Sequence, residues 1–152
     1  MKAFDLLKSR KETVSFAESL TGGLIAATLI GNPGSSAVIC ESYVTYAESS
    51  KQRLLGVKKE TLESDGVVSA ECARQMAAGA RRRSGADWAV SATGLAGPDG
   101  GTDEKPVGTV FIGVSGRKGT RAFEFHFSGD RMAVRLQAVE AALDVLAEEM
   151  SV

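Results

Sequence analysis

The chain has 152 residues, of which 43% are hydrophobic and 24% are charged. This composition excludes disordered, coiled-coil and collagen-like proteins, and the length predicts a single domain spanning residues 1–152. Eighteen Lys and Arg stand against 19 Asp and Glu, a net charge of -1. The balance favours neither nucleic acid nor a membrane surface as a partner. Without a signal sequence or a long apolar run, the sequence predicts a soluble, cytoplasmic protein.

Neither the two cysteines nor the longest basic run indicates a functional site. Cys40 and Cys72 are isolated and lack the close Cys and His spacings of a zinc site, so we interpret both as buried thiols. We expect no metal and no cofactor. Arg81, Arg82 and Arg83 form the longest basic run. We interpret this run as a solvated helix end whose charges complement the helix dipole.

The first half of the chain alternates between helical and extended patterns. Residues 3–10 predict a helix, 13–16 a strand, and 23–30 a helix that ends at a Gly-Asn-Pro turn. Residues 38–46 are rich in β-branched and aromatic side chains and predict a strand. Two short helices are expected at 50–55 and 59–64. Ser69 predicts the N-cap of a longer helix that runs to about Arg83.

The second half adds three strands and a terminal helix. Residues 87–93 predict a buried strand, and 107–115 and 121–127 predict a hairpin around Gly116 and Gly119. Met132, Leu136, Val139, Leu143 and Leu146 form one apolar stripe, which we interpret as the core face of the last helix. The pattern predicts an α/β fold with a mixed, mainly parallel sheet that contains an antiparallel hairpin.

Three polar loops are candidate functional segments, because an open α/β sheet exposes ligand-binding groups at its strand ends. Residues 17–23 place a serine hydroxyl beside the free amides of a helix start, although a plain helix cap has the same pattern. Residues 93–106 form a glycine-rich loop too long for a simple connector. Residues 128–131 bring an arginine to a helix start, which suits a phosphate or a carboxylate, or simply caps the helix.

These segments together resemble a known family. The matching motifs are Ala17-Glu18-Ser19-x-Thr21-Gly22-Gly23, Val44-Thr45-Tyr46 with Lys51 and Gly56-Val57, Gly66-x-Val68-Ser69, Thr93-Gly94-x-Ala96-Gly97-Pro98-Asp99-Gly100-Gly101, Lys105-Pro106-Val107-Gly108-Thr109-Val110, and Ser128-Gly129-Asp130-Arg131. In this order, over nearly the whole chain, they resemble the carboxy-terminal domain family of the competence-damage protein CinA. The resemblance implies a three-layer α/β/α domain. It also implies a nicotinamide-nucleotide amidase, which converts nicotinamide mononucleotide and water into nicotinate mononucleotide and ammonia.

The resemblance assigns the nucleophile to Ser19 and its base to Lys51. A serine hydroxyl needs a base, and a lysine can serve only if its pKa falls toward neutrality. Glu48 stands where relatives commonly carry an amide, and a carboxylate near Lys51 would raise that pKa. The single histidine, His126, lies in a strand pattern, and we interpret it as structural. We expect Tyr46 to orient Lys51 or to relay a proton.

Arg131 is expected to bind the substrate phosphate, with Thr21 and Ser69 as lesser candidates. Backbone amides of the two glycine loops are expected to meet the oxyanion. We expect a pyridine nucleotide as the small-molecule partner, and a homo-oligomer. The alternatives are a non-catalytic nucleotide-binding or competence-related interaction module, and an amidase acting on another small carboxamide. The expected substrate-binding residues are Thr21, Gly22, Gly23, Ser69, Thr93, Gly94, Ala96, Gly97 and Arg131.

Overall fold

A computed structural model describes residues 1–152 and contains one five-stranded sheet with the strand order β2-β1-β3-β4-β5. The strands are β1 (Val14–Glu18), β2 (Ile39–Val44), β3 (Trp88–Gly94), β4 (Thr109–Gly116) and β5 (Gly119–His126). Strand β1 pairs in parallel with β2 and β3, whereas β4 is antiparallel to both β3 and β5. The mixed sheet and its hairpin are therefore confirmed. The prediction that the sheet is mainly parallel is wrong, since two of its four strand pairs are parallel and two are antiparallel.

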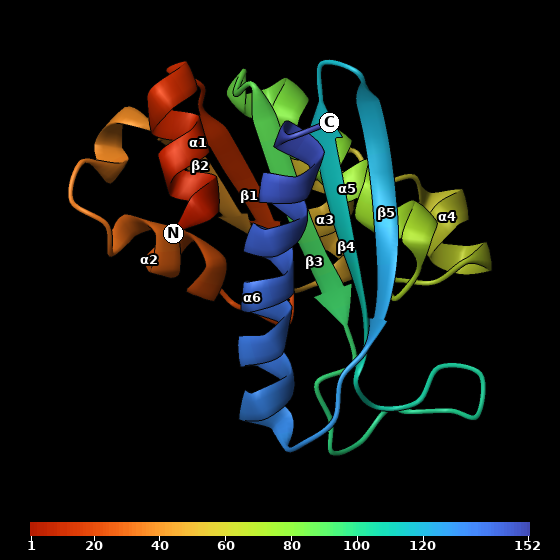
Figure 1. The fold of residues 1–152 in the computed structure, drawn as a ribbon. Coiled ribbons are helices and arrows are strands. Elements are labelled where there is room, and N and C mark those ends of the chain that lie inside the picture. The colour runs from red at the N-terminus through yellow and green to blue at the C-terminus, as the bar shows by residue number, and fades with distance from the viewer.

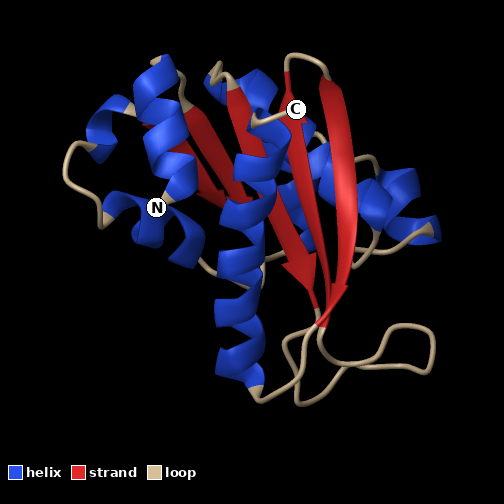
Figure 2. Ribbon diagram, viewed as in Figure 1, coloured by secondary structure: helices blue, strands red, loops and turns tan.

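Helices cover both faces of the sheet, which confirms the three-layer α/β/α arrangement (Figures 1 and 2). One face carries α1 (Lys2–Arg10), α2 (Leu24–Ile30) and α6 (Arg131–Met150). The opposite face carries α3 (Glu48–Leu55), α4 (Lys59–Ser64) and α5 (Ala70–Ser84). A short 3-10 helix, η1 (Ser35–Ala37), precedes β2. None of the helices is both long enough and apolar enough to cross a membrane.

The hydrophobic core is divided by the sheet. Because successive strand residues point to opposite faces, Phe16 of β1 joins the larger cluster under α1, α2 and α6, while Ala17 joins the smaller cluster under α3 and α5. Both residues are fully buried. Strand β1 is therefore covered on both sides, which fixes the position of the turn that follows it.

Local signals in the sequence account for most element boundaries. The Ser69 side chain accepts a hydrogen bond from the backbone of Cys72 and caps α5, as predicted. The β4–β5 register closes with Gly116 opposite Gly119, which confirms the hairpin. Strand β2 is shorter than the predicted residues 38–46, and α3 begins two residues before the predicted residue 50.

Two expectations about burial are wrong. Met132 and Leu136 are 50% and 53% exposed, because the first turns of α6 pack through a different face, that of Val134 and Ala138, both of which are fully buried. Only the later part of the predicted stripe, from Val139 onward, packs against the sheet. Cys40 is exposed because β2 is an edge strand, whereas Cys72 is buried as predicted.

Candidate active site

The candidate site lies at the edge of the sheet where β1, β2 and β3 end. These three strands run in the same direction, so the residues that follow them meet at one edge. Ser19 directly follows β1, and its backbone amide donates to the carbonyl of Ala92 at 3.0 Å. The amide of Thr45, just after β2, donates to the carbonyl of Glu18 at 2.9 Å. The sheet therefore holds Ser19 beside the segment that leads into α3.

Lys51 lies in α3 and points back to Ser19. Its side chain is only 1% exposed, and its Nζ atom lies 3.1 Å from Ser19 Oγ. The same nitrogen lies 2.5 Å from the Thr45 carbonyl oxygen and 3.1 Å from the Tyr46 carbonyl oxygen. Two side chains that are 32 positions apart in the sequence are thus in hydrogen-bond contact.

The surroundings of Lys51 disfavour its charged form. Burial lowers the pKa of Lys51 below its ordinary value of 10.5, and the weaker effects of Cys72 and Glu48 oppose this shift. Burial also raises the pKa of the Cys72 thiol to about 11, so that group carries no charge at neutral pH. Glu48 is exposed to solvent, which screens its carboxylate. The net direction favours a neutral amine despite the carboxylate at position 48.

The hydrogen-bond geometry suits an amine that acts as a base. A neutral lysine amine has two N–H donors and one lone pair, whereas backbone carbonyls only accept. If the two N–H groups donate to the carbonyls of Thr45 and Tyr46, the lone pair remains to accept the hydroxyl proton of Ser19. The three contacts of Lys51 therefore match the three positions around a neutral nitrogen.

Glu18 supports the turn that carries Ser19. Its fully buried carboxylate accepts hydrogen bonds from the backbone amides of Ile25 at 2.9 Å and Ala26 at 3.1 Å, at the start of α2. A carboxylate at this position satisfies free helix amides and complements the helix dipole. Sequence reasoning assigned no role to Glu18. The only available signal was an acidic residue between a strand and a helix start.

A cavity of about 310 Å³ opens in front of Ser19. Arg131, the first residue of α6, crosses this cavity and donates to the Gly97 carbonyl at 2.6 Å and to the Tyr46 hydroxyl at 3.3 Å. It therefore connects α6, the loop after β3 and the segment after β2. Asp99 is the single carboxylate in the lining and makes no ion pair. The lining residues are Ser19, Leu20, Tyr46, Gly94, Leu95, Ala96, Gly97, Asp99 and Arg131.

Free backbone amides lie in the two loops that border this cavity. In the turn after β1, the N–H groups of Leu20 and Thr21 donate to no acceptor in the protein. In the loop after β3, the same holds for Ala96 and Gly97. Donors of this kind can stabilise a developing oxyanion. Leu20, Ala96 and Gly97 line the cavity itself, so their amides are the better placed.

Several predicted substrate-binding residues lie outside this cavity. Ser69 donates its hydroxyl to the Gly66 carbonyl at 2.8 Å, caps α5 and lines a separate hollow. Thr93 is buried and donates to the Val67 carbonyl at 2.7 Å. Thr21 is fully buried, and its hydroxyl has no hydrogen-bond partner. Gly22 and Gly23 have φ angles of 58° and 103°, which shape the turn without lining the cavity.

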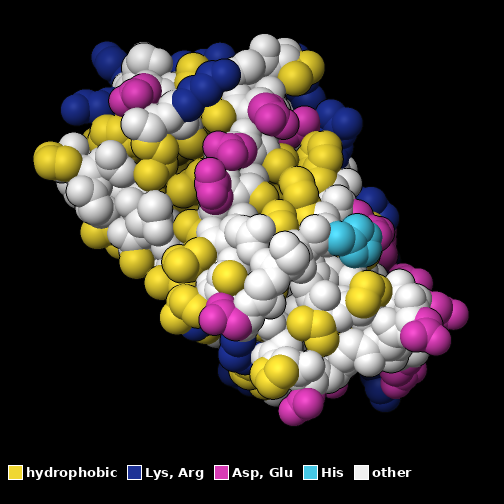
Figure 3. Space-filling view, turned by 60° about the horizontal axis from the view of Figure 1, so that its bottom comes forward, with side chains coloured by type: hydrophobic (Ala, Val, Ile, Leu, Met, Phe, Trp, Pro, Cys, Tyr) yellow, Lys and Arg dark blue, Asp and Glu magenta, His cyan; other side chains and the backbone are white.

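Tyr46 contacts Lys51 through its backbone, and His126 lies outside the cavity. The Tyr46 side chain is 64% exposed and accepts from Arg131, so the residue reaches Lys51 through its carbonyl and not through its phenol. His126 interacts with Glu124 at 2.6 Å on β5 and takes no part in the cavity. Figure 3 shows this histidine on the surface beside acidic side chains. No group of three or more His, Cys, Asp or Glu is placed to hold a metal ion.

The fold and the site define an α/β domain with a serine and lysine pair at the carboxyl edge of a mixed sheet. The family model of the CinA C-terminal domain matches residues 1–150, so the chain belongs to this family. A CinA-like protein of Endomicrobium trichonymphae is 51% identical over 145 residues, which are 95% of this chain and 34% of the relative. The chain thus spans about a third of the length of the curated relatives that it matches.

Solved structures of the same superfamily share the fold. The CinA superfamily protein from Klebsiella pneumoniae 700603 has a TM-score of 0.94 and 35% identity, and the match covers 99% of this chain and 94% of that one. The competence/damage inducible protein CihA from Agrobacterium tumefaciens has a TM-score of 0.93 and 40% identity, with 100% and 97% covered. The five-stranded mixed sheet is therefore the fold of this superfamily.

Proposed function

We propose that this domain is an amidohydrolase that deamidates nicotinamide mononucleotide through an acyl-enzyme on Ser19. The observation that carries the proposal is the 3.1 Å contact between the buried Lys51 amine and the Ser19 hydroxyl. A nucleophile within hydrogen-bond reach of a base of lowered pKa is the arrangement that acyl transfer requires. The choice of nicotinamide mononucleotide as the substrate rests on the resemblance to the CinA carboxy-terminal domain family, which implies nicotinamide-nucleotide amidase activity.

Acylation begins when Lys51 accepts the hydroxyl proton and Ser19 Oγ bonds to the carboxamide carbon. The resulting tetrahedral intermediate carries an oxyanion. The Lys51 ammonium then gives its proton to the amide nitrogen, the C–N bond breaks, and ammonia leaves. Water attacks the ester in the second half of the reaction, with Lys51 accepting one water proton. The bond to Ser19 Oγ breaks, nicotinate mononucleotide is released, and the proton returns to the serine.

The cavity offers a matching group for each part of the substrate. The amides of Leu20, Ala96 and Gly97 are the candidates for the oxyanion hole. Arg131 uses one donor on Gly97 and one on Tyr46, and a guanidinium has five, so donors remain for a phosphate. The carboxylate of Asp99 complements the positive charge of the pyridinium ring.

Ammonia release from nicotinamide mononucleotide by the purified protein tests the proposal. We expect turnover by the wild type and a loss of about a thousandfold or more in Ser19→Ala, because removal of the nucleophile leaves only the binding contributions. Ser49→Ala is a matched control, since Ser49 is exposed and makes no hydrogen bond through its side chain. Lys51→Met is expected to lose turnover, whereas Lys59→Met, at a lysine whose side chain is 73% exposed, is expected to keep it.

Two results would replace the proposed function with one of the alternatives. Tight binding of nicotinamide mononucleotide without ammonia release would indicate a nucleotide-binding module. Turnover of other small carboxamides in preference to nicotinamide mononucleotide would retain the mechanism and replace the substrate. Wild-type rates in Ser19→Ala would contradict the acyl-enzyme itself.

A further inference from the structure

A basic hollow of about 570 Å³ lies at the end of the sheet opposite Ser19. It is bordered by the last turn of α5 and by the β4–β5 hairpin, which Figure 1 shows at the top of the molecule. Arg81, Arg82 and Arg117 line it together with the hydroxyl groups of Ser115 and Thr120. No Asp or Glu belongs to the lining, although acidic residues outnumber basic ones in the chain.

The guanidinium groups of the three arginines have no carboxylate as a direct partner. None of them takes part in any of the ion pairs of the structure. Arg81 donates its Nε to the Asp87 carbonyl at 2.9 Å, and Arg82 donates one amino group to the Leu55 carbonyl at 3.4 Å. Each of these bonds uses one of five donors and restrains the side chain. The remaining donors of both guanidinium groups are available to a ligand.

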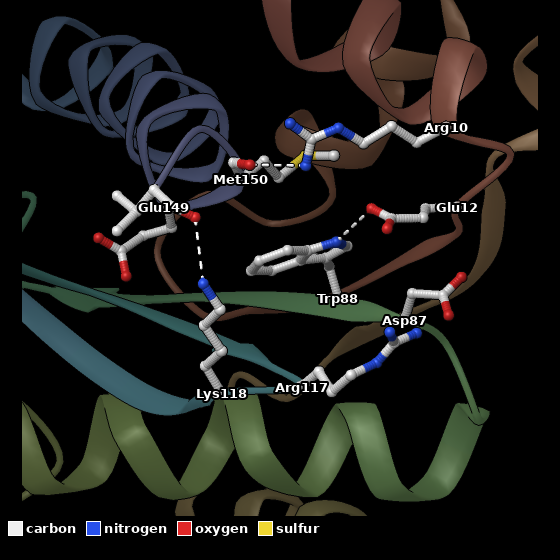
Figure 4. A pocket seen from close by; sticks show the side chains of 9 residues that line it. Arg10, Glu12, Asp87, Trp88, Arg117, Lys118, Glu149 and Met150 are labelled. Carbon is white, nitrogen blue, oxygen red and sulfur yellow. Dashed lines mark hydrogen bonds between the residues drawn. The ribbon is translucent and has the colours of Figure 1, made fainter.

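Arg117 belongs to the hairpin turn and separates this hollow from a second cavity, of about 230 Å³, that contains Trp88. Figure 4 shows Arg117 and Asp87 among the residues that line this second cavity. That carboxylate accepts from the backbone amide of Thr13 at 2.8 Å and from the Thr13 hydroxyl at 3.2 Å, and it forms no ion pair with Arg117. The Arg117 side chain makes no hydrogen bond at all, so its full set of donors is free.

The two hydroxyl groups add a neutral donor. Ser115 Oγ and Thr120 Oγ1 lie 2.8 Å apart across the hairpin. One of their two protons makes the bond between them, and the other is free to point into the hollow. Three guanidinium groups and a hydroxyl form a concave surface of donors. A phosphate group presents several strong acceptor oxygens and a negative charge, which is the complement of this surface.

Basic residues at the end of α5 also complement the helix dipole, which explains charge at positions 81 and 82 without a ligand. The dipole does not explain Arg117, which comes from a different element, or the lack of any acidic lining residue. We propose that this hollow is a second ligand site that binds the phosphate group of a small phosphorylated molecule. A hollow of this size on a chain with net charge -1 fits a small anion better than an extended polyanion.

Trp88, the single tryptophan, provides a probe of this end of the molecule. Its ring packs so closely against Gly116 that a Cβ atom there would lie 2.5 Å from the ring. Gly116 in turn lines the hollow, so a ligand bound to the hairpin is expected to change the fluorescence of Trp88. The titration uses inorganic phosphate as the ligand and chloride to hold the ionic strength constant.

We expect saturable binding by the wild type and a dissociation constant at least about fivefold higher in Arg117→Gln, because one of three guanidinium groups is lost. Arg83→Gln is the matched control. Like Arg117→Gln it removes one positive charge, but Arg83 lies at the end of α5 and does not line the hollow. Arg131→Gln removes the side chain that is proposed to bind the substrate phosphate in the Ser19 cavity. This variant is also expected to leave the Trp88 titration unchanged. Thermal unfolding of each variant verifies its fold.

Two outcomes would overturn the proposal. One is equal weakening in Arg117→Gln and Arg83→Gln, which would indicate a general charge effect. The other is the absence of a saturable phosphate response both in the fluorescence and in the NMR amide shifts of Gly116 and Gly119. Neither measurement depends on amidase activity. The phosphate site can therefore be refuted while the proposed amidase function is supported, and the amidase function can be refuted while the phosphate site is supported.

Discussion

Gly79 connects the packing of two helices to the geometry of the candidate site. A Cβ atom added to Gly79 of α5 would lie 1.9 Å from the Leu55 carbonyl oxygen, which belongs to α3. Real Cβ contacts are not found below 3.0 Å, so Gly79→Ala requires α3 to move by more than about 1 Å. The same helix carries Lys51 one turn earlier. The substitution therefore separates the Lys51 amine from Ser19 without touching either residue.

The expected magnitudes follow from this displacement. Overpacking costs about 1–3 kcal/mol, and the better helix propensity of alanine returns up to about 1 kcal/mol. With the full amount of about 1 kcal/mol returned, the net cost is about 0–2 kcal/mol, so the thermal midpoint should fall by up to about 8 °C in a domain of this size. A misplacement of about 1 Å at a catalytic base lowers the rate by about a hundredfold.

Ammonia release and calorimetric unfolding measure these two effects. Ala78→Gly in the same helix is the control, because it costs helix propensity of about 1 kcal/mol without entering the contact between α3 and α5. Its activity is expected to stay at the wild-type level. A Gly79→Ala variant with higher stability and full activity would refute the link between this contact and the site.

Three further changes test individual residues. Relative to Lys51→Met, the wild-type protein should gain free energy of unfolding as the pH rises toward 10.5, because below that pH the folded wild type, with its lowered Lys51 pKa, binds fewer protons than the unfolded chain. Urea unfolding of both proteins at several pH values measures this change, and a constant difference between them would contradict the lowered pKa. Glu18→Gln should lower the free energy of unfolding by about 1–3 kcal/mol and reduce kcat, since a helix amide loses its charged acceptor; an unchanged denaturation midpoint would argue against the cap. Arg131→Ala should raise KM for the mononucleotide and spare its dephosphorylated analogue; equal losses on both substrates would remove the phosphate assignment.

Sequence periodicity predicted the elements well and burial at their ends less well. The Ser69 cap and the Gly116 to Gly119 hairpin depend on residues that are close in the sequence, so the structure confirms both predictions. Met132 belongs to the same apolar stripe as Leu146, yet of these two only Leu146 is buried, because the first turns of α6 bury the neighbouring face of Val134 and Ala138, which the stripe did not include. The exposure of Cys40 depends on the strand order, which no local pattern records.

The chemistry of the site was accessible from the sequence only in part. The loops that carry Ser19 and Arg131 were identifiable as polar segments at strand and helix ends. The contact between Ser19 and Lys51 requires parallel pairing of β1 and β2 and the return of α3, so the pairing of these two residues was predicted from the family resemblance. The residues alone indicated only that a helix after the strand could direct Lys51 toward the strand ends. The role of Glu18 arises from a buried helix start, which becomes visible only in three dimensions.

The proposed hydrolase requires a neutral amine on Lys51. An NMR titration of the Lys51 side chain, followed through its ε carbon, measures the pKa of that group in the folded protein. The structure predicts a midpoint clearly below 10.5, the ordinary value for lysine, because burial outweighs the nearby carboxylate. A midpoint at or above 10.5 would leave Ser19 without a base and would contradict the proposed hydrolase.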